Sequence, residues 1–280
     1  MYQALTKELF PNLGSLDLFR VNLNNLSVNQ NVISVACRNC QFAIKEPFFD
    51  ENFAFPNTEC LVLDAMLSEI NLEFRLPKLP RLKHLEVRNY VIKDKLSSKK
   101  FPSLRSMVLE GVSVCAGIKI TRLNALHRLE LVDIEKLPLK TNWYGVRMLS
   151  LTKVRGTHLY KLVNIEVFPK LAALYIDIAE DLNLKVLQPH AILKKLSIKT
   201  SGKIPCLSDL QDRFPLIMEI SLDGEVNEMD VPSLPTLKKV EVIPCPLFKY
   251  RRAWFKKCRN LKLFNGKDMK LDQKWFNCNK

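Results

Sequence analysis

Two cysteines separated by two residues, Cys37 and Cys40, are the most suggestive pair of reactive groups in the sequence. Such a pair can bind zinc or perform redox chemistry, but a structural zinc site needs four ligands. The 280 residues contain no second C-x-x-C pair and no pair of histidines that would complete the set. We therefore interpret both cysteines as structural and expect no metal ion.

The histidines and carboxylates do not form a recognisable catalytic motif either. None of His84, His127, His158 and His190 stands in a known catalytic spacing, and no H-E-x-x-H or G-x-S-x-G motif occurs. Only eight glycines are present, which argues against a glycine-rich loop for a nucleotide. We predict a protein that is not an enzyme, uses no cofactor and takes no small-molecule substrate. His190 is expected to be a partly buried spacer.

A repeated spacing of apolar residues along the chain determines where these side chains lie. Twelve mostly apolar residues, here called anchors, follow one another at intervals of 19 to 26 residues, and each of them except the last precedes apolar residues three and five positions later. The anchors are Leu13, Val32, Thr58, Leu82, Leu104, Leu126, Val146, Leu171, Leu193, Ile217, Leu237 and Leu261. Proline stands two residues before seven anchors, and a large apolar residue stands three before most of them, as in Phe101-Pro102-Ser103-Leu104. Proline fixes φ and lacks an N–H, so it suits the position just before a strand.

Each unit predicts a short strand with alternating buried and solvent-facing residues. A single strand with its return loop cannot bury its own apolar side, so neighbouring units must stack. The pattern therefore predicts parallel strands on one side, with loops, 3₁₀ turns and short helices on the other.

The spacing and the L-x-x-L-x-L pattern resemble the leucine-rich-repeat family over essentially the whole chain. The resemblance implies an α/β leucine-rich-repeat solenoid with a curved parallel β-sheet on its concave side. It implies one domain, 1–280, of about twelve repeats. Most members carry Asn or Cys eight residues after the anchor, but here only Cys40 and Cys245 match and most other units carry an apolar residue. With the Phe-Pro-x-Leu openings, this variant resembles the repeats of F-box leucine-rich-repeat proteins.

The two ends differ from the central units. Residues 1–10 are interpreted as the remnant of a preceding repeat or as a thin N-terminal cap, so either Met1 is not the natural start or a thin cap suffices. Residues 246–280 are predicted to form a basic closing repeat and cap. No apolar stretch is long enough to cross a membrane, and the N-terminus does not resemble a signal peptide. We expect a cytoplasmic or nuclear protein with reduced cysteines.

The solvent-facing strand positions are the expected contact surface for a protein partner. Glu86, Val108 and Glu130 should form one column across neighbouring strands, and Arg88 and Glu110 could pair. The predicted partner-binding residues are Glu86, Arg88, Glu110, Glu130, Tyr175, Asp177 and Lys199. Tyr175 would be an aromatic anchor. The alternative is a solvated sheet face without a partner.

The formal net charge is +14, and residues 238–280 contribute +10 of it. Within this end, a segment at 249–259 interleaves cations with aromatic residues, a pattern that can bind nucleic acid or an acidic surface. The possible contacts are Arg251, Arg252, Lys256, Lys257 and Arg259. We favour instead a cap helix that buries Trp254 and Cys258 and exposes its cations.

The function expected from these patterns is a non-catalytic protein–protein interaction module. The first alternative is the substrate-recognition part of an F-box type ubiquitin ligase adaptor, with the F-box missing or upstream of this chain. A weaker alternative is nucleic-acid or acidic-surface binding through the basic end.

Overall fold

A computed structural model describes residues 12–20, 30–38, 40, 56–65, 73–74, 78–89, 91–92, 95–111, 119–121, 123–134, 143–154, 159, 163, 165–204, 207–226, 231–243, 254, 256–265 and 267–268. The chain divides into two compact units, Met1–Val146 and Arg147–Lys280, which we call unit 1 and unit 2. Residues 1–10 lie outside the described residues, so their predicted role as a repeat remnant or cap stays a prediction. The same holds for one continuous domain of about twelve repeats.

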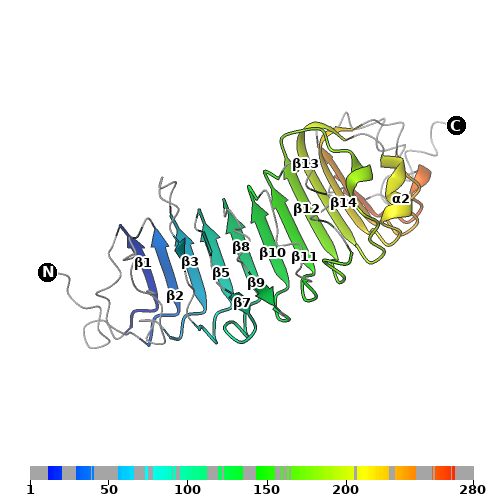
Figure 1. The fold of residues 1–280 in the computed structure, drawn as a ribbon. Coiled ribbons are helices and arrows are strands. Elements are labelled where there is room, and N and C mark those ends of the chain that lie inside the picture. Colours follow the sequence, from blue (N-terminus) through cyan, green and yellow to red (C-terminus); the bar gives the residue numbers. More distant parts are fainter. Residues whose placement is uncertain are drawn as a thin grey trace. The chain divides into compact units, whose positions relative to one another are not determined.

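Unit 1 is built on a sheet of parallel strands that follow one another in chain order (Figure 1). The strands are β1 (Ser15–Phe19), β2 (Ser34–Arg38), β3 (Cys60–Asp64), β5 (His84–Arg88), β8 (Ser106–Glu110) and β10 (Arg128–Val132). Between them, β4 (Glu73–Phe74) pairs with β6 (Val91–Ile92), and β7 (Lys95–Ser97) pairs with β9 (Lys119–Thr121), both in parallel. Each coil of unit 1 therefore stacks on the next.

Unit 2 repeats this arrangement. Its parallel strands are β11 (Met148–Thr152), β12 (Ala173–Ile178), β13 (Lys195–Ile204), β14 (Glu219–Val226), β15 (Lys239–Ile243) and β16 (Leu263–Phe264). The short strand β17 (Lys267–Asp268) pairs with β16 in the antiparallel sense. Helical turns with defined bounds are η2 (Leu184–Val186), η3 (Leu207–Asp209) and α2 (Leu210–Arg213). With so few helices, the α/β class stays a prediction.

The strands begin where the sequence frame places them. Every strand of the two parallel stacks starts two residues after an anchor, and equivalent positions pair in register, as Leu85 pairs with Met107 and Met107 with Leu129. The predicted parallel solenoid of stacked coils is confirmed. Among the described residues, no helix is long and apolar enough to span a membrane.

The core of each unit lies between the sheet and the return segments. All anchors except Leu13 are buried, including the polar Thr58, which has no exposed surface. The position three residues before the anchor is also buried, as at Phe101, Phe168 and Phe214.

His190 occupies the position three residues before its anchor and is 1% exposed, so the prediction of partial burial is wrong. Its Nε2 donates a hydrogen bond to the Phe168 carbonyl oxygen at 2.9 Å, which lets an imidazole replace a phenyl ring in the stack.

The chain leaves several strands through a residue in the left-handed conformation. Arg20, Asn89, Gly111, Asp133 and Lys153 each directly follow a strand and have φ of 53°, 58°, 57°, 52° and 55°. The N–H of Asn89 donates to the Glu110 carbonyl oxygen of the next coil at 2.7 Å, and most of the others bond equivalently. Asn, Gly and Asp tolerate this conformation best, so their recurrence seven residues after the anchor was an overlooked signal.

The last coils of unit 2 end with a side chain that continues the hydrogen-bond ladder. The Asn265 amide accepts from the Val242 N–H at 2.8 Å and donates to the Val242 carbonyl oxygen at 3.0 Å. β16 has only two residues, so its backbone pairs with only part of β15. Asn265 therefore satisfies backbone groups of β15 that a longer strand would otherwise pair.

Candidate functional site

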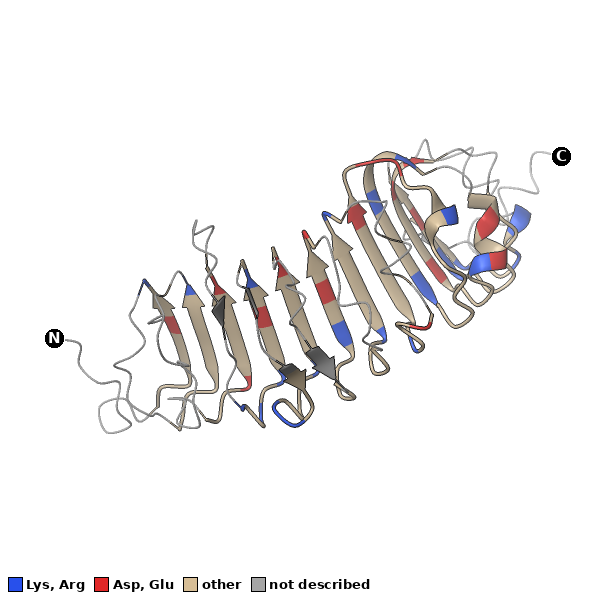
Figure 2. Cartoon of the chain, viewed as in Figure 1, with Lys and Arg blue, Asp and Glu red and all other residues tan. Residues whose placement is uncertain are grey.

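The outward side of the sheet, here called the strand face, carries most of the predicted contact residues. In most strands the second and fourth residues are buried, whereas the first, third and fifth stay partly exposed. Figure 2 shows charges of both signs along the strands.

In unit 1, the predicted residues Glu86, Arg88 and Glu110 meet in one ion-pair network. Arg88 Nε lies 2.5 Å from a Glu86 carboxylate oxygen and 3.3 Å from one of Glu110. His84 Nε2 lies 3.7 Å from the second Glu86 oxygen. The expected Arg88–Glu110 pair is confirmed, and Glu86 joins it because its strand position lies beside Arg88. The network holds two carboxylates around one guanidinium.

The expected column of Glu86, Val108 and Glu130 is also present. Glu86 and Glu130 both pair in register with Val108, and Glu130 is bonded to Arg128 at 3.3 Å. However, Val108 is buried, although the sequence placed it in this solvent-facing column. Val108 is a short residue between the longer Glu86 and Glu130 on the adjacent strands, which cover it. The exposed part of this column is therefore acidic rather than mixed.

In unit 2, Tyr175 is half-buried beside a lysine that the sequence analysis did not single out. Lys195 Nζ lies 5.5 Å from the centre of the Tyr175 ring and 3.4 Å from a Glu219 carboxylate oxygen. Burial lowers the pKa of Lys195, but Tyr175 and Glu219 outweigh burial and the net pKa is raised. Lys195 is therefore a fixed cation that holds the ring, as expected for a cation–π contact.

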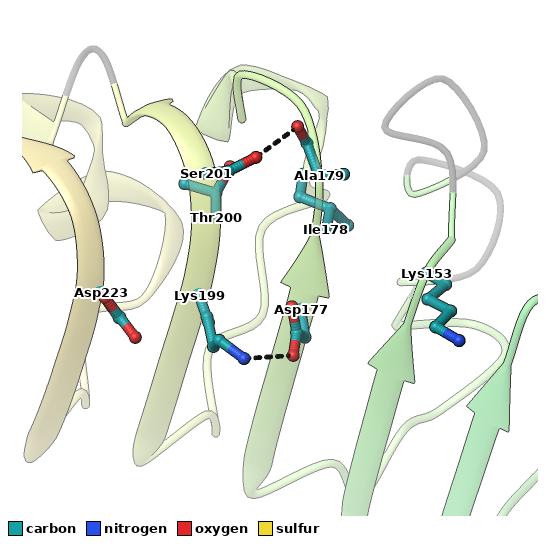
Figure 3. A pocket seen from close by; sticks show the side chains of 8 residues that line it. All are labelled: Lys153, Asp177, Ile178, Ala179, Lys199, Thr200, Ser201 and Asp223. Atoms are coloured by element: carbon teal, nitrogen blue, oxygen red, sulfur yellow. Dashed lines mark hydrogen bonds and ion pairs between the residues drawn. The ribbon is translucent and has the colours of Figure 1, made fainter.

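Asp177 and Lys199, the other two predicted residues of unit 2, lie in a shallow pocket at the ends of the strands (Figure 3). Lys199 Nζ bonds a carboxylate oxygen of Asp177 at 3.1 Å. The pocket has a volume of about 280 Å³ and is lined by Lys153, Asp177, Ile178, Ala179, Lys199, Thr200, Ser201 and Asp223. Its two lysines and two aspartates cancel in formal charge, so it does not select an ion of one sign.

Hydrogen bonds to the preceding coil fix the rim of this pocket. The Ser201 hydroxyl donates to the Ala179 carbonyl oxygen at 2.7 Å, and the Thr200 hydroxyl donates to that of Glu180 at 2.5 Å. Ser201 stands eight residues after its anchor, where the sequence led us to expect an apolar plug in most units. The serine hydroxyl at this position bonds a backbone group of the preceding coil, which is the role expected of Asn or Cys in a leucine-rich repeat.

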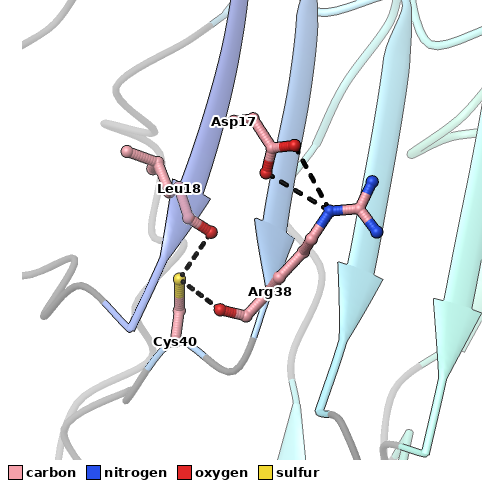
Figure 4. A network of polar contacts seen from close by, with 4 residues as sticks. All are labelled: Asp17, Leu18, Arg38 and Cys40. Atoms are coloured by element: carbon pink, nitrogen blue, oxygen red, sulfur yellow. Dashed lines mark hydrogen bonds and ion pairs between the residues drawn. The ribbon is translucent and has the colours of Figure 1, made fainter.

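A further network in unit 1 was missed by the sequence analysis (Figure 4). Arg38 Nε donates to both carboxylate oxygens of Asp17 at 3.3 Å. Cys40 Sγ donates to the backbone carbonyl oxygens of Leu18 at 3.4 Å and Arg38 at 3.5 Å. Opposite charges at outward positions of consecutive strands were the available signal for the ion pair. Cys40 thus fills the structural role predicted from its column, while Cys245 lies outside the described residues.

Among the described residues, no three His, Cys, Asp or Glu side chains gather as metal ligands. The pKa of the Cys37 thiol is raised by its hydrogen bond with Cys40 and by burial, and burial raises that of Cys258. Burial lowers the pKa of His190, against the opposing effect of its bond to Phe168. These shifts favour neutral, unreactive side chains.

The basic segment near the C-terminus is described only in part. Trp254 and Cys258 have no exposed surface, whereas Lys256, Lys257 and Arg259 are exposed. The Lys257 ammonium donates to the Val231 carbonyl oxygen at 2.7 Å. The residues of the predicted cap therefore separate into a buried apolar set and an exposed cationic set. Arg251 and Arg252 lie outside the described residues, and the contact role of all five cations stays a prediction.

A scan against models of protein families found no match, and a search among curated proteins found no relative.

Proposed function

We propose that this protein is a non-catalytic interaction module of the leucine-rich-repeat type, which binds a protein partner on its strand face. The observation that carries the proposal is the arrangement of the strand face. Rows of half-exposed side chains are held in fixed positions by ion pairs across consecutive strands, as in the Arg88 network and the Asp177–Lys199 pair. Side chains that are already ordered lose less conformational entropy when a partner binds.

The chemistry of the face favours a protein over a small molecule. The pocket of about 280 Å³ at the strand ends is shallow and of mixed charge, whereas small-molecule sites are concave and mostly apolar. Tyr175 provides an aromatic surface beside Lys195, and tyrosine is enriched among residues that dominate binding energy at protein interfaces. We therefore expect a partner with its own mixed charges and an apolar contact for Tyr175.

The test compares two double variants. Tyr175→Ala with Asp177→Ala removes the aromatic surface and one ion pair of the strand face. Tyr144→Ala with Asp212→Ala is the matched control, because both residues are exposed and neither occupies a strand. Proteins captured from cytosol by each form are quantified by mass spectrometry, and the affinity of each purified partner is then measured by calorimetry.

We expect at least one partner to bind wild type and control equally and to lose about tenfold or more in affinity for the strand-face variant. Equal retention of every captured protein by all three forms would contradict the proposal. The F-box type adaptor role stays a prediction of the sequence, because none of the contacts above bears on it.

A further inference from the structure

A second groove in unit 2 lies where the strands begin, away from the pocket at their ends. It has a volume of about 460 Å³ and is lined by Lys194, Leu216, Met218, Pro235, Thr236, Lys238, Asn260 and Lys262. The backbone places one residue from each of four consecutive coils in a row. The backbone N–H of Met218 donates to the carbonyl oxygen of Lys194, and that of Lys238 donates to the carbonyl oxygen of Met218. The N–H of Lys262 donates in turn to the carbonyl oxygen of Lys238, and the three distances are 2.7 to 2.8 Å.

The lining of this groove, which we call the basic groove, carries charge of one sign. Three of its eight residues are lysines and none is acidic. Lys194, Lys238 and Lys262 are all exposed, and no carboxylate among the described residues forms an ion pair with any of them. The mixed-charge pocket of the strand face differs in this respect. Lysines gathered without counter-charges create a local field that favours an anionic ligand.

The floor between the lysines is apolar. Leu216 is 47% exposed, and Met218 and Pro235 line the groove beside it. Outside the lining, Ile192 is 39% exposed on the coil of Lys194 and stands one residue before its anchor, as Leu216 does. Exposed apolar side chains gathered in a hollow mark a contact site more often than isolated ones do. The groove thus joins an apolar floor to a cationic rim.

Hydrogen bonds between coils hold the walls in place. The Thr236 hydroxyl contacts the carbonyl oxygens of Pro215 at 3.1 Å and Ile217 at 2.7 Å. The Asn260 amide donates to the Pro235 carbonyl oxygen at 2.5 Å. The groove is therefore formed before any ligand arrives, which lowers the entropic penalty of binding.

We propose that the basic groove binds an acidic peptide segment that carries one large apolar side chain. Consecutive coils lie about 4.8 Å apart, so the backbones at Lys194 and Lys262, three coils apart, are separated by about 14 Å. Residues i and i+4 of an extended peptide lie on one side about 13 Å apart, so carboxylates at these two positions match the two lysines. The side chain at i+2 lies on the same side, midway between the carboxylates, and would contact Leu216. This site is separate from the strand face and does not depend on the function proposed for that face.

Two other anionic partners fit the groove less well. Single-stranded nucleic acid is bound by stacking its bases on aromatic side chains, and the lining contains no aromatic residue. An anionic bilayer presents a broad surface, whereas the apolar residues here lie in a hollow of about 460 Å³. Both alternatives serve as competing outcomes in the test.

The test uses a fluorescein-labelled nonapeptide with glutamates four residues apart and one phenylalanine midway between them. Its binding to the full chain is followed by fluorescence anisotropy. We expect the triple variant Lys194→Glu, Lys238→Glu and Lys262→Glu to lose at least about tenfold in affinity. The control variant Lys78→Glu, Arg81→Glu and Lys99→Glu makes the same change in net charge on exposed residues of unit 1, and its affinity should stay within about twofold of wild type.

A double-mutant cycle tests the apolar floor without depending on charge. Leu216→Ser should weaken the phenylalanine peptide about fivefold but hardly affect a peptide with alanine at the same position. Binding that is undetectable in wild type, equal losses in both triple variants, or an unchanged phenylalanine preference in Leu216→Ser would each overturn the proposal. So would tighter binding of a labelled oligothymidine or of phosphatidylserine vesicles that depends on the same three lysines.

Discussion

Replacing His190 with leucine should remove a component of stability that depends on pH. The His190 ring is 1% exposed, and its Nε2 donates to the Phe168 carbonyl oxygen at 2.9 Å. Its Nδ1 is buried with no hydrogen-bond partner among the described atoms, so a proton added there would lie in an apolar stack. Burial therefore lowers the pKa of His190 from its ordinary value of 6.5, and the Phe168 bond only partly opposes this.

The direction of the pH effect follows from this lowered pKa. As pH falls below about 6.5, the imidazole gains a proton in the unfolded chain first, while the folded protein still holds it neutral. The unfolded state then binds more protons, so the free energy of unfolding falls with pH until the folded pKa is reached. One group can contribute a slope of at most about 1.4 kcal/mol per pH unit. At about pH 7.5 and above, it contributes no slope.

Urea unfolding at about pH 7.5 and about pH 5.5 measures this effect in wild type and in His190→Leu. Leucine leaves the Phe168 carbonyl oxygen unpaired, so it should cost about 1–3 kcal/mol at both pH values. The loss of stability between the two pH values should nevertheless be smaller than in wild type. His127→Leu, at an exposed histidine, is the control and should keep the wild-type difference. A pH dependence in His190→Leu equal to that of wild type would refute the assigned role of the buried imidazole.

Three further predictions test the packing. A methyl group at Gly145 would lie 2.5 Å from the Asn124 carbonyl oxygen, so Gly145→Ala should lower the free energy of unfolding by about 1–3 kcal/mol. Gly14→Ala meets no atom within 4 Å and should change it by less than about 1 kcal/mol; equal effects in the two variants would contradict the packing at Gly145. Trp254→Ala removes a fully buried indole and should lower the stability of unit 2 by about 3–5 kcal/mol in urea unfolding, whereas a loss below about 1 kcal/mol would show that the indole is not buried in solution. In the native protein, iodoacetamide should alkylate the partly exposed Cys60 before the buried Cys37, as read by peptide mass spectrometry, and the reverse order would contradict their burial.

Much of the strand arrangement could be predicted because the apolar positions within each repeat determine which of its residues are buried. Leu82 is buried with Leu85 and Val87, and the strand His84–Arg88 begins two residues after this anchor. Alternation then places Glu86 and Arg88 outward, and the parallel register brings Arg88 to Glu110 on the next strand. Each step needs only the period of a strand and the need to hide its apolar side.

What the sequence determined by itself is therefore the frame: where strands begin, which side chains turn inward and which charges face outward. Only the tertiary structure decided the environment of each outward residue, because neighbours on adjacent coils come from roughly 20 or more residues away in the chain. That is why Val108 is covered between its neighbours and why His190 finds the Phe168 carbonyl oxygen. It is also why Lys194, Lys238 and Lys262, each of which stands one residue after an anchor, line one groove. The alternation of buried and exposed residues is a property of each strand by itself. The surface around an exposed residue depends on which residues of the neighbouring coils stack beside it.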